Sequence, residues 1–504
     1  MVLAPCHFCL FCVTGGFTIS HIVRLIETSA ILDMDATTLA SMIKNKNIRS
    51  VDVTNKFIQH LQSINPSIHC VVEERFSDAL HEAERSDDLL DSGQGGGRLF
   101  GVPISVKKSL DVKGMRTTGG LIHRSDYVAS HDSEAVRRLK KEGAIVLCKT
   151  NTSTACLTFE SNNKLYGRTN NPWCMAKTAG GSSGGEAALI ASGGAAAGVG
   201  SDLAGSLRLP AHFNGVISFK SGANAIPLTG HFPKPIHQLQ SNMMGLGPMT
   251  KSVADSELMY TIMSDIPMEK IDPSVFRLIM PPILGKYPLS KDIEQVWRAV
   301  RQFFKGMFIE KELPGFIWRT PLLHLQVLTI NGAKDLYPSL FNKTSFPLFQ
   351  AWLREKIRHD TDYDRHFLKT MLLAKAGSKL FRTKVSSNRI KKLRAKILEW
   401  QNQFDQFLDR SVLLLPVFGK PAGYHGELAK ELLSNRFLYR KCMPFTVLPN
   451  VLGLPALSIP IARNKSKLPI SVQLIAKRGN EQALFYYGRL LEKHFLGYER
   501  AVLE

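Results

Sequence analysis

One lysine and two serines are the residues of this chain whose types and spacing could do chemistry. Lys107 ends an apolar stretch, Ser182 lies in a glycine turn, and Ser206 follows two small residues. A serine hydroxyl becomes an effective nucleophile only when a nearby base takes its proton. A lysine can be that base if burial keeps its amine neutral, because its ordinary pKa is about 10.4. The three residues therefore indicate a serine hydrolase that works without histidine.

Two other serine motifs compete with this interpretation. Gly181–Gly185 matches G-x-S-x-G, the nucleophile elbow of α/β-hydrolases, with Ser183 as the nucleophile. That elbow follows a strand, whereas residues 170–173 before it are typical of a loop. Residues 105–108 match S-x-x-K, a motif that belongs at the start of a helix, but here they fall in a predicted strand. We therefore set both motifs aside.

Helices and strands are predicted to alternate along the chain. Asp35, Ser50 and Ser252 are typical helix N-caps, and Asp255 would complete a capping box with Ser252. Helices are predicted over about 36–44, 51–64, 79–91, 133–143, 186–191, 253–263 and 481–494, and Pro66 ends the second of them. Strands are predicted over about 99–106, 144–147, 412–416, 456–460 and 470–475. The alternation predicts an α/β fold with a large mixed β-sheet covered by helices on both faces.

The chain of 504 residues is strongly basic, with 64 Lys and Arg against 43 Asp and Glu. Residues 354–398 alone carry 14 basic side chains against four acidic ones. Such a surplus suits nucleic acid or an anionic membrane surface, and a solvated helical face is the simpler alternative. No aromatic platform or nucleic-acid motif accompanies the charges, so we expect no nucleic-acid partner.

The N-terminal segment is apolar and rich in cysteine. Cys6, Cys9 and Cys12 lack the fourth ligand of an iron–sulfur motif, and eight cysteines in a chain this long do not form a disulfide framework. No Asp, Glu, Lys or Arg precedes Arg24, and the basic leading region of a secretory signal is absent. We interpret residues 1–30 as a membrane anchor. The alternatives are a buried or surface-lying segment and a wrongly assigned start of the chain.

Three stretches resemble the amidase signature family, whose enzymes use a Ser–cis-Ser–Lys triad: Phe100–Lys107, Gly180–Glu186 and Gly200–Pro210. Shorter stretches agree, so that the resemblance extends over about Asp35–Tyr498; they are Lys149–Asn151, Gly247–Val253, Gly453–Ala456 and Leu468–Leu474. Within the family the chain looks closest to the fatty-acid amide hydrolase 2 branch, on Tyr166–Pro172, Glu186 and Pro210–Gly215.

The resemblance implies the amidase-signature fold in a single catalytic domain over residues 31–504. A divergent region at about 264–440 would contribute the substrate channel. Ser206 would be the acylated nucleophile, Lys107 the base, and Ser182 the bridging serine after a cis Gly181–Ser182 peptide bond. The resemblance implies no cofactor and no metal.

The resemblance also implies roles around the triad. The backbone N–H groups of Leu203, Ala204, Gly205 and Ser206 would bind the oxyanion. Asp202 and Arg208 would pair to hold this loop, with Ser183 in a supporting position. Cys156 falls where the family has a residue that lines the substrate site, and a buried apolar cysteine is the alternative. The mechanism does not need His123, His237 or His425, which we interpret as structural or exposed.

The chain departs from the family pattern near these residues. Lys108 stands where an acidic residue is usual, Ser201 where threonine is common, and the stretch around Ser221 differs from the usual Gly-x-Lys-Pro-Thr loop. Lys108 should point away from Lys107 if the strand is pleated, and its charge would disfavour protonation of Lys107. None of the departures removes a member of the triad, so they bear on rate and loop rigidity.

The leading hypothesis is a serine hydrolase that cleaves acyl amides, in particular fatty-acid amides, through an acyl-enzyme. We expect a small lipid amide as substrate, a membrane surface as partner and a membrane-associated, intracellular location, and a homodimer is left open. One alternative is an amidase for a short amide or for glutamine in aminoacyl-tRNA metabolism. The other is a non-catalytic membrane or nucleic-acid binder on an amidase scaffold.

Overall fold

The computed structural model describes residues 28–269, 271–381, 388–434 and 443–503. The cysteine-rich segment and nearly all of the anchor predicted for residues 1–30 lie outside this part of the chain. None of the helices described combines the length and the apolar composition needed to cross a bilayer.

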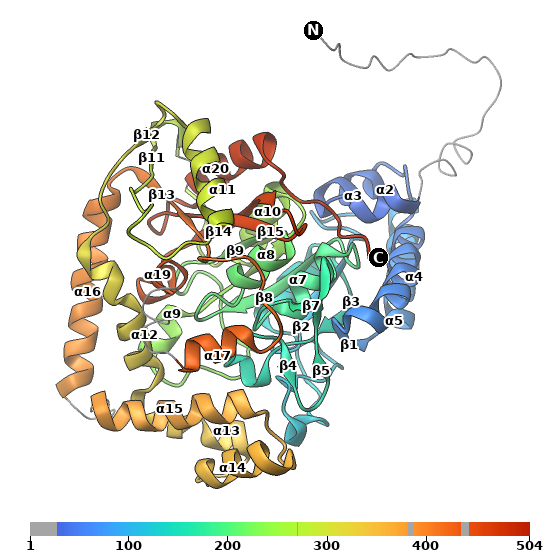
Figure 1. Ribbon diagram of the computed structural model, residues 1–504. Helices are drawn as coiled ribbons and strands as arrows, with labels where there is room; N and C mark the ends of the chain where they lie inside the picture. The colour runs from blue at the N-terminus through green and yellow to red at the C-terminus, as the bar shows by residue number, and fades with distance from the viewer. Residues whose placement is uncertain (1–27, 270, 382–387, 435–442, 504) are drawn as a thin grey trace.

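The centre of the molecule is one mixed sheet of eleven strands in the order β1-β3-β2-β8-β10-β9-β14-β15-β13-β11-β12 (Figure 1). Their bounds are β1 Val71–Glu74, β2 Pro103–Lys107, β3 Ile145–Thr150, β8 Ala197–Asp202, β9 Ile217–Lys220, β10 Gly245–Thr250, β11 Arg277–Ile279, β12 Phe308–Ile309, β13 Ser411–Pro416, β14 Ala456–Arg463 and β15 Pro469–Ile475. Two small ribbons lie beside it: β4 Asn162–Asn163 with β5 Gly167–Arg168, and β6 Asn170–Asn171 with β7 Cys174–Thr178. The predicted mixed sheet is confirmed.

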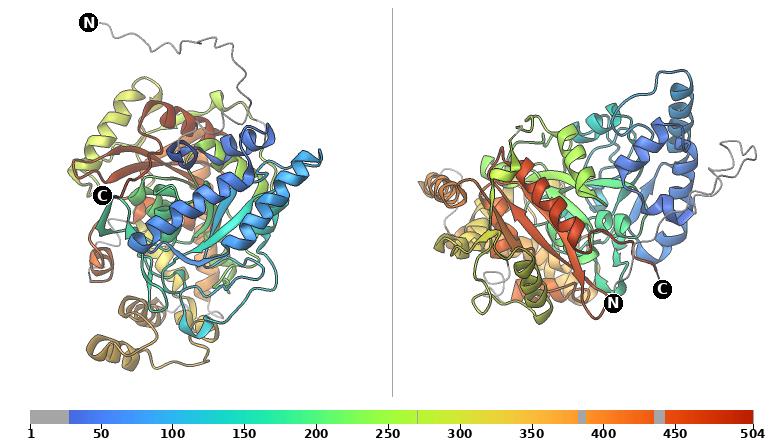
Figure 2. Two further views of the ribbon diagram at one scale, coloured as in Figure 1. Left: turned by 90° about the vertical axis from the view of Figure 1, so that its right-hand side faces the viewer. Right: turned by 90° about the horizontal axis from the view of Figure 1, so that it is seen from above.

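Helices cover both faces of this sheet (Figures 1 and 2). They are α2 Thr28–Asp33, α3 Ala36–Lys44, α4 Ser50–Ile68, α5 Phe76–Asp91, α6 Glu134–Lys141, α7 Gly184–Ala191, α8 Arg208–Asn214, α9 Gln238–Met243, α10 Val253–Met263, α11 Lys291–Phe303, α12 Thr320–Leu328, α13 Tyr337–Phe341, α14 Leu348–Arg358, α15 Arg365–Phe381, α16 Asn388–Leu408, α17 Glu427–Ser434, α19 Pro444–Val451 and α20 Glu481–His494. Adjacent residues of β15 show this, because their side chains point to opposite faces of the sheet. Gln473 of β15 contacts Arg208 of α8, whereas Leu457, which pairs with Leu474, packs under Gly488 of α20.

Two local predictions were wrong. Pro66 does not end α4, which continues to Ile68 and stops at His69 in the left-handed conformation. A proline in the last turn removes only one backbone donor, so the helix tolerates it there. The capping box of α10 is half formed. Ser252 Oγ accepts the Asp255 N–H at 3.1 Å, but the Asp255 carboxylate accepts the N–H groups of Ala36 and Thr37 at the start of α3.

The order of the strands brings the predicted chemistry to one edge. β2 is parallel to both β3 and β8, so the carboxyl ends of β2 and β8, at Lys107 and Asp202, lie side by side. Helix α7 packs tightly beneath them, because a Cβ at Gly198 would lie 1.6 Å from Glu186 Oε1. The Glu186 carboxyl accepts hydrogen bonds from Ser105 and Thr150, which ties α7 to β2 and β3.

Candidate active site

The amine of Lys107 lies in the interior at the end of β2. Its Nζ is 2.7 Å from Ser182 Oγ and 3.0 Å from Ser201 Oγ, and the residue is fully buried. Burial lowers the pKa of Lys107, because the charged ammonium loses its hydration, and this outweighs the opposite effects of Cys156 and Asp202. The geometry and the electrostatics therefore favour a neutral amine in contact with a serine hydroxyl.

The turn that carries Ser182 is held rigidly. The Gly181–Ser182 peptide bond is cis, as the resemblance implies. The Ser182 carbonyl accepts hydrogen bonds from Thr152 Oγ1 at 2.8 Å and Ser161 Oγ at 3.1 Å. A Cβ at Gly181 would lie 2.6 Å from the Glu160 backbone nitrogen, so only glycine fits there. The surroundings thus hold the Ser182 hydroxyl against Lys107.

Ser206 lies in the neighbouring turn, between β8 and α8. It is 6% exposed, and its carbonyl accepts the Ser183 N–H at 3.2 Å, which joins the two serine turns. Gly205 has a φ of 99°, and a Cβ there would lie 2.2 Å from Thr446 Cγ2. Glycine is therefore required just before Ser206, on both conformational and steric grounds.

Ser183, the competing nucleophile, has a different environment. It is fully buried, and its hydroxyl donates to the Ser201 carbonyl of β8 at 3.3 Å. This hydrogen bond directs the Ser183 hydroxyl towards β8.

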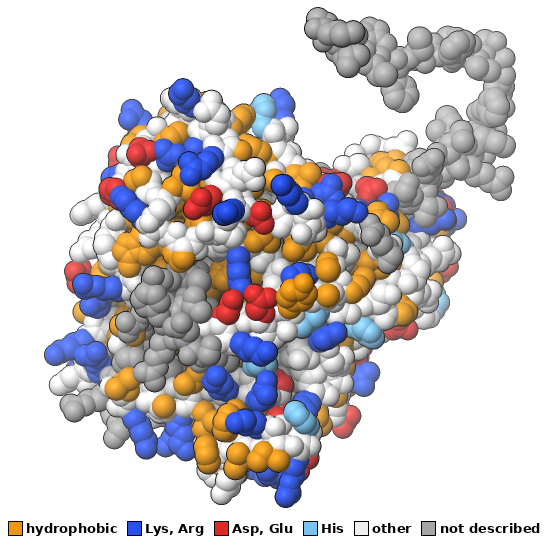
Figure 3. Space-filling view, in the orientation of Figure 1, with side chains coloured by type: hydrophobic (Ala, Val, Ile, Leu, Met, Phe, Trp, Pro, Cys, Tyr) orange, Lys and Arg blue, Asp and Glu red, His pale blue; other side chains and the backbone are white. Residues whose placement is uncertain are grey.

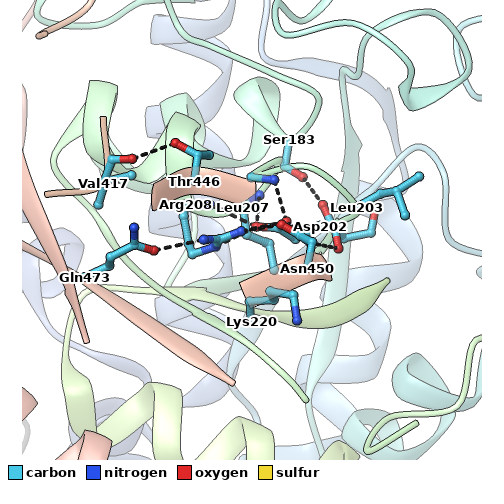
Figure 4. A network of polar contacts seen from close by, with 12 residues as sticks. Ser183, Asp202, Leu203, Leu207, Arg208, Lys220, Val417, Thr446, Asn450 and Gln473 are labelled. Carbon is cyan, nitrogen blue, oxygen red and sulfur yellow. Dashed lines mark hydrogen bonds and ion pairs between the residues drawn. The ribbon is translucent and has the colours of Figure 1, made fainter. Parts of the chain in front are cut away.

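A buried ion pair holds the turn that carries Ser206 (Figure 4). Arg208 Nε lies 3.1 Å from Asp202 Oδ2, and both side chains are inaccessible to solvent. The same guanidinium donates to Gln473 Oε1 at 2.8 Å and to Asn450 Oδ1 at 2.7 Å. Although burial alone would raise it, Arg208 holds the pKa of Asp202 well below its ordinary value. The pairing expected for Asp202 and Arg208 is therefore present, and its hydrogen bonds extend to α19 and β15, which are far away in the sequence.

The structure corrects one of the four predicted oxyanion donors. The Gly205 N–H donates to Asp202 Oδ1 at 2.6 Å, so it is not free to bind a substrate oxygen in this structure. A carboxylate three residues earlier in the same turn lies within easy reach of this amide. The N–H groups of Leu203, Ala204 and Ser206 have no hydrogen-bond acceptor in the described part of the chain, so they remain the candidate donors.

Lys108 points away from Lys107, as the strand pleat predicts. Its Nζ forms an ion pair with Glu73, and burial lowers the pKa of Lys108 to about 8. The Cys156 side chain is half-buried, and its thiol contributes to the electrostatic surroundings of Lys107. Cys156 Sγ also lies 3.4 Å from Thr152 Oγ1.

The three histidines set aside as structural hydrogen-bond to backbone groups: His123 to Ser339, His237 to Leu239, and His425 to Met175. Two other histidines that the sequence did not single out reach the site. His324 of α12 lies with Nε2 3.0 Å from the Leu203 carbonyl, and His231 lies with Nε2 3.0 Å from Ser201 Oγ. No local motif marks either residue, because each comes from a segment distant in sequence.

Comparison with known proteins identifies the family. A family model described as Amidase matches residues 52–282 and 350–485. The chain belongs to the amidase family. It is an amide hydrolase.

The similarity of this amidase to its relatives extends over nearly the whole chain. It is 30% identical to fatty-acid amide hydrolase 2-B of Danio rerio, over 94% of this chain and 91% of the relative. It is 27% identical to a glutamyl-tRNA(Gln) amidotransferase subunit of Bdellovibrio bacteriovorus, over 90% of this chain and 95% of the relative. A solved structure of 6-aminohexanoate cyclic dimer hydrolase matches with a TM-score of 0.77 at 21% identity, covering 94% of this chain and 99% of the other. The last similarity shows a shared fold.

Removing Arg208 from the amidase should destabilise it strongly. We expect Arg208→Ala to lower the free energy of unfolding by about 3–5 kcal/mol, because the Asp202 carboxylate is left buried without its charged partner. Urea unfolding at pH 7 measures this. The matched control is Arg98→Ala, which breaks the half-exposed pair with Glu142 at 3.0 Å and should cost about 1 kcal/mol or less. Equal losses in the two variants would contradict a structural role for the buried pair.

The difference between wild type and Arg208→Ala should also depend on pH. Because the folded pKa of Asp202 is depressed, its contribution to stability is complete above the unfolded pKa of about 3.9. It is lost as the pH falls below that value through the folded pKa. The two unfolding free energies should therefore converge in acid.

Proposed function

We propose that this amidase cleaves fatty-acid amides through an acyl-enzyme on Ser206. The observation that carries the proposal is the 2.7 Å contact between the buried Lys107 amine and the Ser182 hydroxyl. This contact places a base next to Ser182. The hydrogen bond from the Ser183 N–H to the Ser206 carbonyl joins the turn of Ser182 to the turn of Ser206.

The proposed acylation transfers one proton through two hydroxyls. Ser206 Oγ attacks the amide carbonyl carbon, its proton passes to Ser182 Oγ, and the Ser182 proton passes to neutral Lys107. The carbonyl oxygen becomes an oxyanion, which the N–H groups of Leu203, Ala204 and Ser206 stabilise. One such donor typically contributes about 2.7–4 kcal/mol to transition-state stabilisation.

Collapse of the tetrahedral intermediate breaks the C–N bond. Protonated Lys107 returns its proton through Ser182 to the departing amine nitrogen, which leaves the acyl group on Ser206 and Lys107 neutral. Water then attacks the acyl ester with the same relay as base. The carboxylic acid leaves and the Ser206 hydroxyl is restored.

An apolar environment next to the nucleophile turn supports an acyl substrate. Ala204 packs against a buried cluster, together with the partly buried Phe159 and Leu325. Leu325 belongs to α12, whose His324 contacts the Leu203 carbonyl. Helix α12 lies in the divergent region 264–440, so we assign this region to the substrate channel. The similarity to a fatty-acid amide hydrolase supports the same substrate class.

An alkyl fluorophosphonate should label Ser206. We expect Ser206→Ala to lose the label and Ser183→Ala to keep it, because Ser183 faces the sheet. The labelling rate should rise with pH and level off above the folded pKa of Lys107, since the neutral amine is the active form. Its midpoint should lie below the ordinary value of about 10.4. Mass spectrometry of the labelled peptide and rates between pH 6 and 10 measure both. A folded wild-type protein that stays unlabelled would refute the mechanism.

Acyl length should control the specificity constant. Each methylene buried in the channel contributes about 0.8 kcal/mol, or roughly fourfold in kcat/KM, until the channel is full. A series of primary amides from two to twenty carbons, with glutamine measured for ammonia release, separates the proposal from its rivals. A flat or falling series would favour the short-amide enzyme. Hydrolysis of glutamine above that of the long amides would favour an aminoacyl-tRNA amidotransferase, which the second relative supports.

We also propose that α14 docks the protein on an anionic membrane. Its outer face exposes Phe349, Leu353 and Ile357 by 62%, 40% and 65%, while Leu348, Ala351 and Glu355 face the protein. The exposed cations Lys356 and Arg358 lie in its last turn. Figure 3 shows apolar and basic side chains side by side at the end of the molecule where α14 lies. Apolar side chains flanked by cations suit a lipid surface of negative charge.

The triple variant Phe349→Ser, Leu353→Ser and Ile357→Ser should bind phosphatidylserine vesicles at least about tenfold more weakly, since burying one such side chain is worth about 1.5–3 kcal/mol. Vesicle sedimentation measures this. The control replaces Ile236, Val275 and Met307 by serine, because these residues are 52%, 51% and 56% exposed but lie outside α14. Equal binding by the α14 variant and wild type would contradict docking through α14.

A further inference from the structure

Backbone hydrogen bonds hold His231 near the end of β2, the strand that carries Lys107. It belongs to the loop between β9 and α9, and it forms an isolated antiparallel bridge with Leu110, three residues after Lys107. The Asp111 N–H donates to the Gly230 carbonyl, and the Phe232 N–H donates to the Ser109 carbonyl, both at 2.8 Å. His231 is 6% exposed. The loop therefore fixes a buried imidazole beside the end of β2.

The two ring nitrogens of His231 face different partners. Nδ1 lies 3.1 Å from the Pro233 carbonyl oxygen, which can only accept, so Nδ1 carries the proton. Nε2 is then an acceptor, and it lies 3.0 Å from Ser201 Oγ. The opposite tautomer would set the Nδ1 lone pair against that of the carbonyl. The Ser201 hydroxyl consequently donates to His231.

The orientation of the Ser201 hydroxyl also fixes its hydrogen bond with Lys107. Because the Ser201 proton is used on His231, Ser201 Oγ accepts from Lys107 Nζ at 3.0 Å. A neutral lysine amine has two N–H groups and one lone pair. We infer that His231 is a positioning residue that orients the Ser201 hydroxyl. The Ser201 oxygen then accepts one N–H of Lys107, and the Lys107 lone pair is left for the Ser182 proton. The inference rests on the proposed role of Lys107 as base.

The surroundings of His231 keep its ring neutral, so that the ring continues to accept the hydrogen bond from Ser201. Burial lowers the pKa of His231 to about 3, because the charged imidazolium would lose its hydration, so the imidazole is neutral at working pH. A protonated His231 would donate to Ser201, whose hydroxyl would turn to the Lys107 lone pair and block the base. The other groups that act on Lys107 are Cys156, Asp202 at the end of β8 and Glu186 of α7. Among the described residues, none of their side chains hydrogen-bonds to the Ser201 hydroxyl or to the His231 ring.

The test compares two substitutions of His231. His231→Leu removes the acceptor for Ser201, so we expect kcat and the fluorophosphonate labelling rate to fall at least about tenfold with KM within about twofold, a part of the 10²–10⁴-fold that an acid–base group contributes. His231→Gln can place an amide oxygen near the Nε2 position and should stay within about threefold of wild type in the same assays. The control is His60→Leu, a half-buried histidine of α4 that hydrogen-bonds to the Ser192 carbonyl. Thermal unfolding of each variant verifies folding.

A double-mutant cycle separates positioning from a general structural role. After Ser201→Ala has cut the link, His231→Leu should reduce the rate by no more than about twofold further. Losses that multiply, or a His231→Leu enzyme as fast as wild type, would overturn the inference while leaving the acyl-enzyme mechanism intact. Loss of labelling in the wild type itself would instead refute the proposed function.

A readout that does not need activity tests the tautomer directly. The ¹⁵N chemical shifts of the His231 ring, assigned by comparison with His231→Gln, should show Nδ1–H and an unprotonated Nε2 from pH 6 to 9. An Nε2–H tautomer or an imidazolium at pH 7 would overturn the inference.

Discussion

A lysine amine buried among hydroxyl groups is the constraint on which this active site depends. Lys107 Nζ contacts two serine oxygens and forms no ion pair among the described residues. An unpaired ammonium is costly to bury, so the interior favours the free base. The tight packing at Gly181 and of α7 on β8 holds the Ser182 turn in place, with its hydroxyl against that amine.

The turn that carries Ser206 depends on partners far from it in sequence. Asp202 and Arg208 are six residues apart, but their charges are satisfied by Asn450 and Gln473 from the last part of the chain. This network joins the turn between β8 and α8 to α19 and β15. A buried ion pair is favourable only when its remaining hydrogen-bonding groups are satisfied, and here the distant amides do that. The loop geometry is therefore a property of the whole fold.

Sequence reasoning succeeded where the physical cause was local. The bounds of α3, α10 and α20 follow from caps and periodicity within each segment, and the buried strands were evident from their apolar runs. Sequence reasoning failed where a carboxylate could accept hydrogen bonds from more than one set of N–H groups. Asp255 caps α3 in place of its own helix, and the Gly205 amide bonds to Asp202, so neither could be predicted from spacing.

By itself, the sequence determined the fold class, the family and the residues available for chemistry, because glycine turns, buried strands and a lysine at a strand end are encoded in short segments. Only the tertiary structure decided how those residues are used. It separated Ser183 from Ser182 by turning its hydroxyl to the sheet, and it brought His231 and His324 to the site from loops and helices with no motif of their own. The physical reason is that proton direction and burial depend on neighbours in space, which adjacent positions in a sequence do not specify.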